Sequence, residues 1–530
     1  MRKIRLILSF LTLLSLGLSA QDFKVVRGNC MPGPEGSGDV VESRQETTRR
    51  MLPQINHDWN PERIYHQLVI LVSFSDQDFN VEDPMSVYDQ MFNLSGYNQR
   101  KGPGCVADYY RDQSGGKLNL KFDVYGPIKV DTLSQPYPNP NENTKNYGSV
   151  ILRRATLQFL DSVAAGVYDS YGWDGDFGKY DWNNNGFINQ VIYVYAGLPG
   201  NISSDNCYGH IWPNTSAFST ITTASGYKIA NYTCSGELWP TSPLRSCGIG
   251  TICHEFTHSL GLPDIYPTTN DAGYSVCDEW DLMDGGNFTN YGWCPPNLTA
   301  MEKMLLGWLT PIDLTEPATI TDLKPSAEGG EVYRIKHSDS EWLLLENRQQ
   351  SGWDLGAPGK GLVIYHVNYD GSAWHGNSVN NDPGKRRFYL FPADNKDYDT
   401  WDKEIGGKNP YANSSRMNNR HLSTSPYPYV GTDEVLNNKL TDTSTPASIM
   451  YYPDGSLLGK PITNITMTDE GLISFDFMGG NPSGIKDIQV SGFRFQDYYD
   501  LQGRYIQYPV RGQLYLVRKV DGSICKYLYK

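Results

Sequence analysis

The stretch His254-Glu255-Phe256-Thr257-His258-Ser259-Leu260-Gly261-Leu262-Pro263-Asp264 decides more about the fold and chemistry of this chain than any other. On a helix, His254 and His258 project from one face about a turn apart, close enough to bind one Zn²⁺. Glu255 follows the first histidine, where its carboxylate can take a proton from a zinc-activated water and later return it to a leaving amine. The stretch therefore predicts a helix that carries a catalytic zinc site.

The residues after this helix predict the third zinc ligand. Gly261 can enter left-handed backbone at little steric cost and so end the helix. Asp264 can then complete a set of two imidazoles and a carboxylate, which leaves the fourth position for water. Glu279 is the alternative, at the distance of a thermolysin-like glutamate ligand. We favour Asp264, because the segment around Glu279 has the character of a tight turn containing Met283.

The chain resembles the immune inhibitor A (M6) family of secreted metallopeptidases, and the resemblance extends beyond the zinc motif to about residues 62–395. The segments that carry it are 66–76, 106–114, 118–127, 180–186, 234–238 and 343–349.

The resemblance implies an α/β (α+β) metzincin-like zinc metallopeptidase domain with endopeptidase activity on proteins. It also implies that His254, His258 and Asp264 bind zinc, that Glu255 is the general base and acid, and that Met283 lies in the turn beneath the metal.

The N-terminus has the composition of a secretory signal peptide, over residues 1–20. Basic residues precede a mostly apolar run over 6–18, and Ser19-Ala20 offers a cleavage site. We therefore expect export, to the medium or the cell surface, and no later stretch has the roughly 18 apolar residues of a membrane span. Residues 21–60 are a candidate pro-segment, with paired arginines at Arg49-Arg50.

The remaining chain divides by composition into three parts. Residues 61–315 form the expected catalytic domain, which includes a core helix over 298–306. Residues 316–480 contain short apolar runs separated by turn residues, which predicts an antiparallel β-sandwich. Residues 481–530 predict a small terminal β-module that resembles a type IX secretion sorting domain; the alternative is a terminal β-module without an export function.

A second metal site, for Ca²⁺, is indicated before the zinc helix. Asp181, Asn183 and Asn185, followed by Gly186, have the spacing of an EF-hand-type loop. The position of the bidentate glutamate holds Ile192, which cannot coordinate a metal. The alternative interpretation is an Asn/Gly-rich turn that leads into a strand.

The nine cysteines allow several arrangements, because export permits disulfides. Cys30 could cap the zinc through its thiolate and keep the enzyme latent, or it could be an ordinary disulfide or free thiol. Sequence proximity suggests three local pairs without deciding among connectivities: Cys207–Cys234, Cys247–Cys253 and Cys277–Cys294. Glu237 and Glu346 are candidate hydrogen-bond partners for the ligating histidines, or else ordinary surface or strand-end glutamates.

The formal charge of −14 argues against nucleic acid or an anionic membrane surface as a partner. Protein or peptide substrates are the expected partners, and the sequence does not predict an oligomeric state. The alternative function is a secreted or surface binding protein with a non-catalytic zinc site. The two functions differ in whether a chelator-sensitive hydrolysis of protein is present.

Overall fold

The structure is a computed structural model that describes most of the chain between residues 55 and 480. The described residues are 24–25, 55–135, 147–203, 210–240, 243–268, 275–382, 384–397, 422–432, 434–450, 456–480, 495–500, 504–506, 514–519 and 524–528. The predicted signal peptide, most of the candidate pro-segment, Cys30 and Cys207 lie outside these residues.

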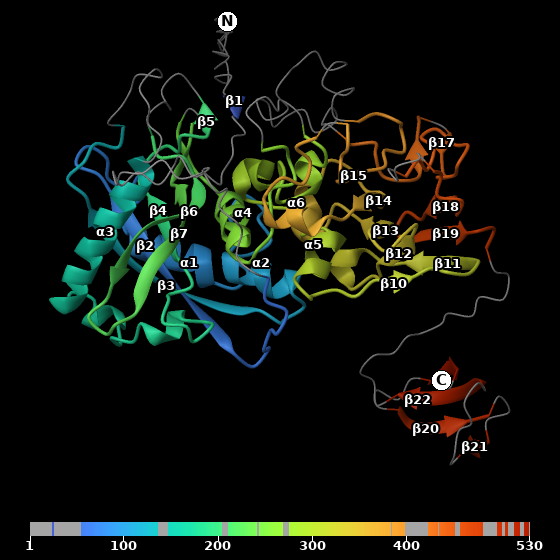
Figure 1. Cartoon of the computed structure of the whole chain (residues 1–530), viewed down its shortest axis with the longest axis horizontal. Coiled ribbons are helices and arrows are strands. Elements are labelled where there is room, and N and C mark those ends of the chain that lie inside the picture. The colour runs from blue at the N-terminus through green and yellow to red at the C-terminus, as the bar shows by residue number, and fades with distance from the viewer. Residues whose placement is uncertain are drawn as a thin grey trace, which may run out of the picture.

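A mostly parallel five-stranded sheet forms the first region of the molecule (Figure 1). Its order is β3-β2-β4-β7-β6, and only the edge strand β6 runs antiparallel to its neighbour. The central strand β2 contains the apolar run of residues 68–72, whose side chains are all buried, as expected for a parallel strand covered on both faces. The strand bounds are β2 Ile64–Ser73, β3 Asn119–Lys129, β4 Val191–Tyr195, β6 Asn214–Thr222 and β7 Lys228–Gly236.

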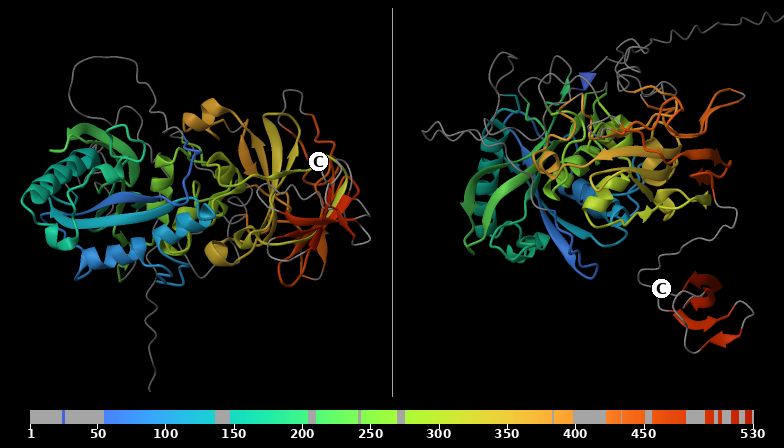
Figure 2. Two further views of the ribbon diagram at one scale, coloured as in Figure 1. Left: turned by 90° about the horizontal axis from the view of Figure 1, so that it is seen from below. Right: turned by 45° about the vertical axis from the view of Figure 1, so that its right-hand side comes forward.

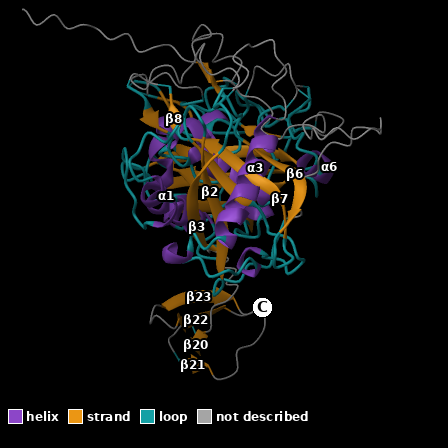
Figure 3. Ribbon diagram, turned by 90° about the vertical axis from the view of Figure 1, so that its left-hand side faces the viewer, coloured by secondary structure: helices purple, strands orange, loops and turns teal. Residues whose placement is uncertain are grey.

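Helices cover both faces of this sheet, and each face has its own apolar core. The helix α3 (Tyr147–Ala164) packs on one face with Ile151, Leu152 and Phe159. The helices α1 (Pro84–Asn93), α2 (Val106–Gln113) and α4 (Gly250–Ser259) pack in the core on the other face. Figure 3 shows α1 and α3 on opposite sides of the sheet.

The second region is built from antiparallel strands. A five-stranded sheet has the order β10-β12-β13-β14-β15, and a three-stranded sheet has the order β11-β19-β18. Figure 2 shows these strands gathered at the end of the molecule away from α3. The bounds are β10 Ile312–Asp313, β11 Ala318–Leu323, β12 Tyr333–Lys336, β13 Glu341–Arg348, β14 Gly361–Asn368, β15 Phe388–Leu390, β18 Ile462–Met467 and β19 Ile473–Phe477.

Both faces of the five-stranded sheet are buried, against different partners. Side chains alternate along a strand. On β13, Leu343 and Leu345 lie in a core shared with the three-stranded sheet, whereas Trp342 and Leu344 lie in the core that contains the zinc-motif helix. The apolar core therefore continues across residue 315, where the sequence suggests a domain boundary.

The core helix expected over 298–306 is α5 (Ala300–Leu305), which begins with Thr299 and Glu302 in a capping box. A short helix, α6 (Gly371–His375), follows β14. Six short 3₁₀ segments complete the helical structure described: Asp169–Tyr171, Gly178–Tyr180, Asp278–Trp280, Gly286–Gly292, Ser326–Glu328 and Gly352–Gly356.

Two pieces of the segment that precedes the first sheet pack against the rest of the chain. The strand β1 (Lys24–Val25) pairs antiparallel with β5 (Ile202–Ser203). Ile55 and Trp59 pack against the core around α4, and the indole Nε1 of Trp59 donates a hydrogen bond to the carbonyl of Leu306 at 2.8 Å.

Smaller sheets complete the described residues. The pair β8 (Leu238–Trp239) and β9 (Arg245–Ser246) precedes α4, and β16 (Tyr429–Val430) pairs with β17 (Val435–Asn437). A separate sheet near the C-terminus has the order β21-β20-β22-β23, with bounds Tyr505–Ile506, Phe495–Tyr499, Leu514–Lys519 and Ile524–Leu528. Among the described helices, none combines the length and apolarity needed to cross a membrane.

The predicted local disulfides are wrong. Cys247 and Cys253 are both free, and so are Cys277 and Cys294. Cys234, suggested as a partner for Cys207, is also a free thiol. All five are buried, so burial raises the pKa of each thiol and keeps it protonated. These cysteines act as small apolar core residues.

Candidate metal centre

The helix α4 carries the zinc motif and enters the core through glycines. A Cβ atom at Gly250 would lie 2.1 Å from the carbonyl oxygen of Asn287, so only glycine allows this close approach. The α-helix ends at Ser259, and Gly261 then has a φ of +102°, the left-handed conformation expected at this position. The chain turns there and brings Asp264 back beside the helix.

Three side chains converge at this turn. His254 Nε2 lies 3.3 Å from Asp264 Oδ1, and His258 Nε2 lies 3.2 Å from the same oxygen. The ligand atoms that these three residues offer all lie within 4.8 Å of one another. Two imidazole nitrogens and one carboxylate oxygen are the donor set of a catalytic zinc site with one position left open. The residues present therefore fit a zinc ion.

Backbone carbonyl groups orient both imidazoles. His254 Nδ1 donates to the carbonyl of Leu282 at 2.7 Å, and His258 Nδ1 donates to that of Leu262 at 2.8 Å. These bonds place the Nδ1 protons away from the cluster and leave the Nε2 lone pairs for a metal.

The hydrogen-bond partners of the two imidazoles are thus backbone carbonyl groups, and the suggestion that Glu237 and Glu346 are these partners is wrong. Glu237 instead accepts hydrogen bonds from the backbone of Asn80 and Gly197. Glu346 pairs with Arg348.

Asp264 is held in place by a residue from the second region. Asn377, which follows α6, accepts a hydrogen bond from the backbone N–H of Asp264 at 2.6 Å and donates one from Nδ2 to Asp264 Oδ2 at 2.8 Å. Asp264 Oδ1 is the oxygen that faces both imidazoles. Burial alone would raise the pKa of Asp264, but His258 and His254 lower it well below the usual range. Asp264 is therefore an ionised candidate ligand with a fixed orientation.

Glu255 is buried beside the cluster, on the side of α4 that faces the first sheet. Thr215, at the start of β6, lies with its Oγ1 2.5 Å from the backbone carbonyl oxygen of Glu255 and 3.3 Å from Oε2. Burial raises the pKa of Glu255 to about 8, and His254 opposes that shift. A carboxyl group with a raised pKa can exchange a proton near neutral pH, as a general base and acid must.

The turn that contains Met283 lies directly against the cluster. The backbone N–H of Met283 donates to Asp281 Oδ1 at 2.7 Å, and its carbonyl accepts from Ile265 at 2.8 Å. The preceding residue, Leu282, supplies the carbonyl that orients His254. Glu279, the alternative ligand, is not part of the metal-ligating group found among the described residues.

The loop suggested for Ca²⁺ is stabilised by its own side chains. Asp181 accepts hydrogen bonds from the backbone N–H groups of Asn185 and Gly186 at 3.1 and 2.7 Å. Asn185 Oδ1 accepts from Phe187, and Asn183 is exposed. Ile192, in the position of the missing glutamate, is buried in β4. Calcium binding by this loop stays a prediction.

Two residues that the sequence did not suggest contact this centre, Thr215 and Asn377. Thr215 belongs to a polar strand start with no distinguishing pattern. Asn377 begins the run Asn377-Ser378-Val379-Asn380-Asn381, whose asparagines indicate a hydrogen-bonded loop. Nothing in that run indicates which residues it contacts, so its partner could not be inferred.

Ligating histidines one turn apart on a buried helix, with a glutamate between them, are the arrangement of metallopeptidase catalytic domains. Residues 62–306 belong to this class. They match the immune inhibitor A peptidase M6 catalytic domain.

Two curated relatives match part of the chain. The chain is 25% identical over 257 residues to Immune inhibitor A of Bacillus thuringiensis subsp. alesti. This match covers 42% of the chain and 36% of the relative. The chain is 20% identical over 224 residues to Pre-pro-metalloprotease PrtV of Vibrio cholerae serotype O1 (strain M66-2). This match covers 39% of the chain and 24% of the relative. The matches therefore span well under half the length of these relatives.

Proposed function

We propose that this protein is a secreted zinc-dependent endopeptidase that hydrolyses peptide bonds of proteins. The observation that carries the proposal is the convergence of His254, His258 and Asp264 within 4.8 Å of one another, beside a buried glutamate. The match to a peptidase catalytic domain and the similarity to Pre-pro-metalloprotease PrtV support the same reaction class. His254, His258 and Asp264 would hold the metal through Nε2, Nε2 and Oδ1.

Zinc, when bound, supplies a Lewis acid that polarises the scissile carbonyl and lowers the pKa of water from about 15.7 toward about 7. Glu255 takes the proton from the attacking water. The same carboxyl group then returns that proton to the nitrogen of the leaving amine as the C–N bond breaks. Asn377 keeps Oδ1 of Asp264 turned toward the imidazoles throughout, since it holds Oδ2.

The test separates metal binding from hydrolysis. Glu255→Gln keeps the shape of the side chain and removes its ability to carry the proton. We expect stoichiometric zinc in both proteins by elemental analysis, and casein hydrolysis on the order of 10² to 10⁴ times slower in the variant. Equal hydrolysis by the two proteins would refute the role of Glu255. Stoichiometric zinc without hydrolysis by the wild type would favour a binding protein.

We propose the remaining organisation from the sequence patterns given above. Residues 1–20 direct export to the medium or the cell surface, residues 21–60 include a pro-segment, and residues 481–530 act as a sorting module of the type IX kind. The metzincin-like character of residues 61–315 is supported by the turn that contains Met283, since the preceding Leu282 accepts a hydrogen bond from His254 Nδ1. The β-sandwich proposed for residues 316–480 is supported by the core between its two sheets.

A further inference from the structure

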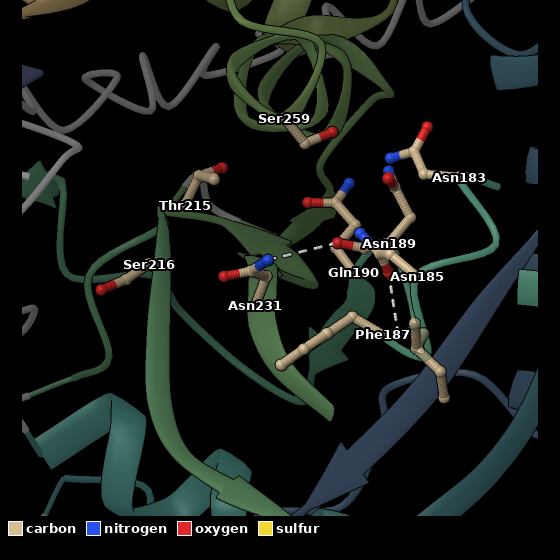
Figure 4. Close-up of a pocket in the computed structure, with 10 residues that line it drawn as sticks. Asn183, Asn185, Phe187, Asn189, Gln190, Thr215, Ser216, Asn231 and Ser259 are labelled. Carbon is tan, nitrogen blue, oxygen red and sulfur yellow. Dashed lines mark hydrogen bonds between the residues drawn. The ribbon is translucent and has the colours of Figure 1, made fainter. Parts of the chain in front are cut away.

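A cavity of about 150 Å³ lies between the first sheet and the C-terminal end of α4. Its walls come from the loop before β4, the start of β6, the strand β7 and the helix, as Figure 4 shows. The lining side chains are Asn183, Asn185, Phe187, Ile188, Asn189, Gln190, Thr215, Ser216, Asn231 and Ser259.

This cavity shares its wall with the proposed active site. Thr215 lines it and also lies with Oγ1 3.3 Å from Glu255 Oε2. Ser259 lines it from the helix and directly follows His258 in the sequence. A side chain that enters the cavity would therefore belong to a peptide lying close to the proton-transfer group.

One wall group is a buried hydrogen-bond donor without a partner among the described residues. Gln190 is 1% exposed, and its Oε1 accepts a hydrogen bond from Thr233 Oγ1 at 3.0 Å. In this orientation of the amide, Nε2 has no hydrogen-bond partner among the described residues. Burial of such a donor reduces the stability of the folded protein unless an acceptor forms a hydrogen bond with it.

The lack of charged residues in the cavity wall restricts the class of side chain that can bind there. None of the ten lining residues is acidic, basic or a histidine. A charged side chain placed there would gain no ion partner from these ten residues, whereas an uncharged polar side chain can exchange its water for hydrogen bonds with them. A carboxamide offers an acceptor oxygen for Gln190 Nε2 and donors for the hydroxyl and amide oxygens of the wall.

We propose that this cavity is a specificity subsite that binds a glutamine or asparagine side chain of the protein substrate. The inference rests on the proposed endopeptidase function and adds to it the class of side chain selected. Gln190 is the residue that distinguishes a carboxamide from an apolar side chain of similar length.

The test uses three sets of peptides that carry Gln, Met or Glu in turn at each position beside the scissile bond. With the wild-type protein, we expect one position at which kcat/KM is about tenfold or more higher for Gln than for Met or Glu, the value of one well-made hydrogen bond. In Gln190→Met the ratio of Gln to Met peptides should fall toward one. Ser216→Leu, which narrows the cavity from another wall, should lower the same ratio.

Gln158→Met is the matched control. Gln158 lies on α3 and also has a buried amide atom that finds no hydrogen-bond partner in the described part of the chain, but it does not line the cavity. This variant should keep the wild-type ratio, and thermal unfolding of all three variants checks that each is folded. Hydrolysis with an unchanged ratio in both cavity variants would overturn the subsite and leave the endopeptidase proposal standing. Complete absence of hydrolysis by the wild type would overturn both.

Discussion

The two regions of this molecule contribute to the metal centre in different ways. The first region supplies every candidate ligand from one short stretch, residues 254–264. The second region supplies no ligand among the described residues, but its Asn377 fixes the orientation of Asp264 and its sheet completes the core around α4. The family match over residues 62–306 therefore includes the candidate metal ligands but not Asn377, which orients one of them.

The largest effect is expected from removing the second region, which tests whether the first region folds without it. A chain that ends at Pro311 would expose the core side chains that Trp342, Leu344 and Tyr365 cover. We expect this fragment to lose cooperative thermal unfolding and its near-ultraviolet circular dichroism, because its core would be incomplete. A chain that ends at Gly480 keeps both regions and is the control. Cooperative unfolding of the shorter fragment at the temperature of the control would show that the first region is independent.

A smaller effect is expected from a buried ion pair of the second region that also contacts the first region. Arg348 on β13 contacts both oxygens of Asp354 through Nε at 2.6 Å and a terminal nitrogen at 2.5 Å, and it contacts Glu346 at 3.2 Å. Another contact joins it to the carbonyl of Asn297, before α5. Arg348→Ala leaves buried carboxylates unpaired, so we expect the free energy of unfolding to fall by about 3–5 kcal/mol in denaturant titrations.

The control for this change is Arg334→Ala. Arg334 contacts Asp313 at 2.6 Å, but both side chains are partly exposed, at 21% and 39%. A pair that water can reach contributes little, so this variant should lose about 1 kcal/mol or less. Equal losses for the two arginines would contradict a special role for the buried contact.

The most selective change concerns Asn377 alone. Asn377→Ala removes both hydrogen bonds to Asp264 but leaves all three candidate ligands unchanged. We therefore expect zinc affinity to weaken by about 10- to 100-fold in a chelator competition. Asn381→Ala is the matched control, since Asn381 bonds Thr268 in the same pair of loops but no ligand. Equal zinc affinity in the two variants would contradict the role assigned to Asn377.

The local part of the site could be predicted from the sequence, because its geometry follows from helical spacing. His254, His258 and the helix end at Gly261 lie within one continuous stretch, and one turn of backbone brings Asp264 to them. The apolar run of residues 68–72 in β2 is likewise a local signal, typical of a strand buried on both faces.

The non-local contacts could not be predicted. Asn377 lies 113 residues from Asp264, and no periodicity links the two. The cysteine pairs were wrong for the same reason, since closeness in sequence does not bring two thiols together. The glutamate partners of the histidines were wrong because nearby carbonyl groups already occupied both Nδ1 positions.

Trp59 sets a limit on how the N-terminus can be trimmed. Its ring lies 5.9 Å from that of Trp308, and its indole nitrogen is bonded to Leu306. An activating protease that cut after Trp59 would remove part of the hydrophobic support beneath the zinc-motif helix. A cut at Arg49-Arg50 would spare Ile55 and Trp59, so the mature enzyme should begin upstream of Ile55.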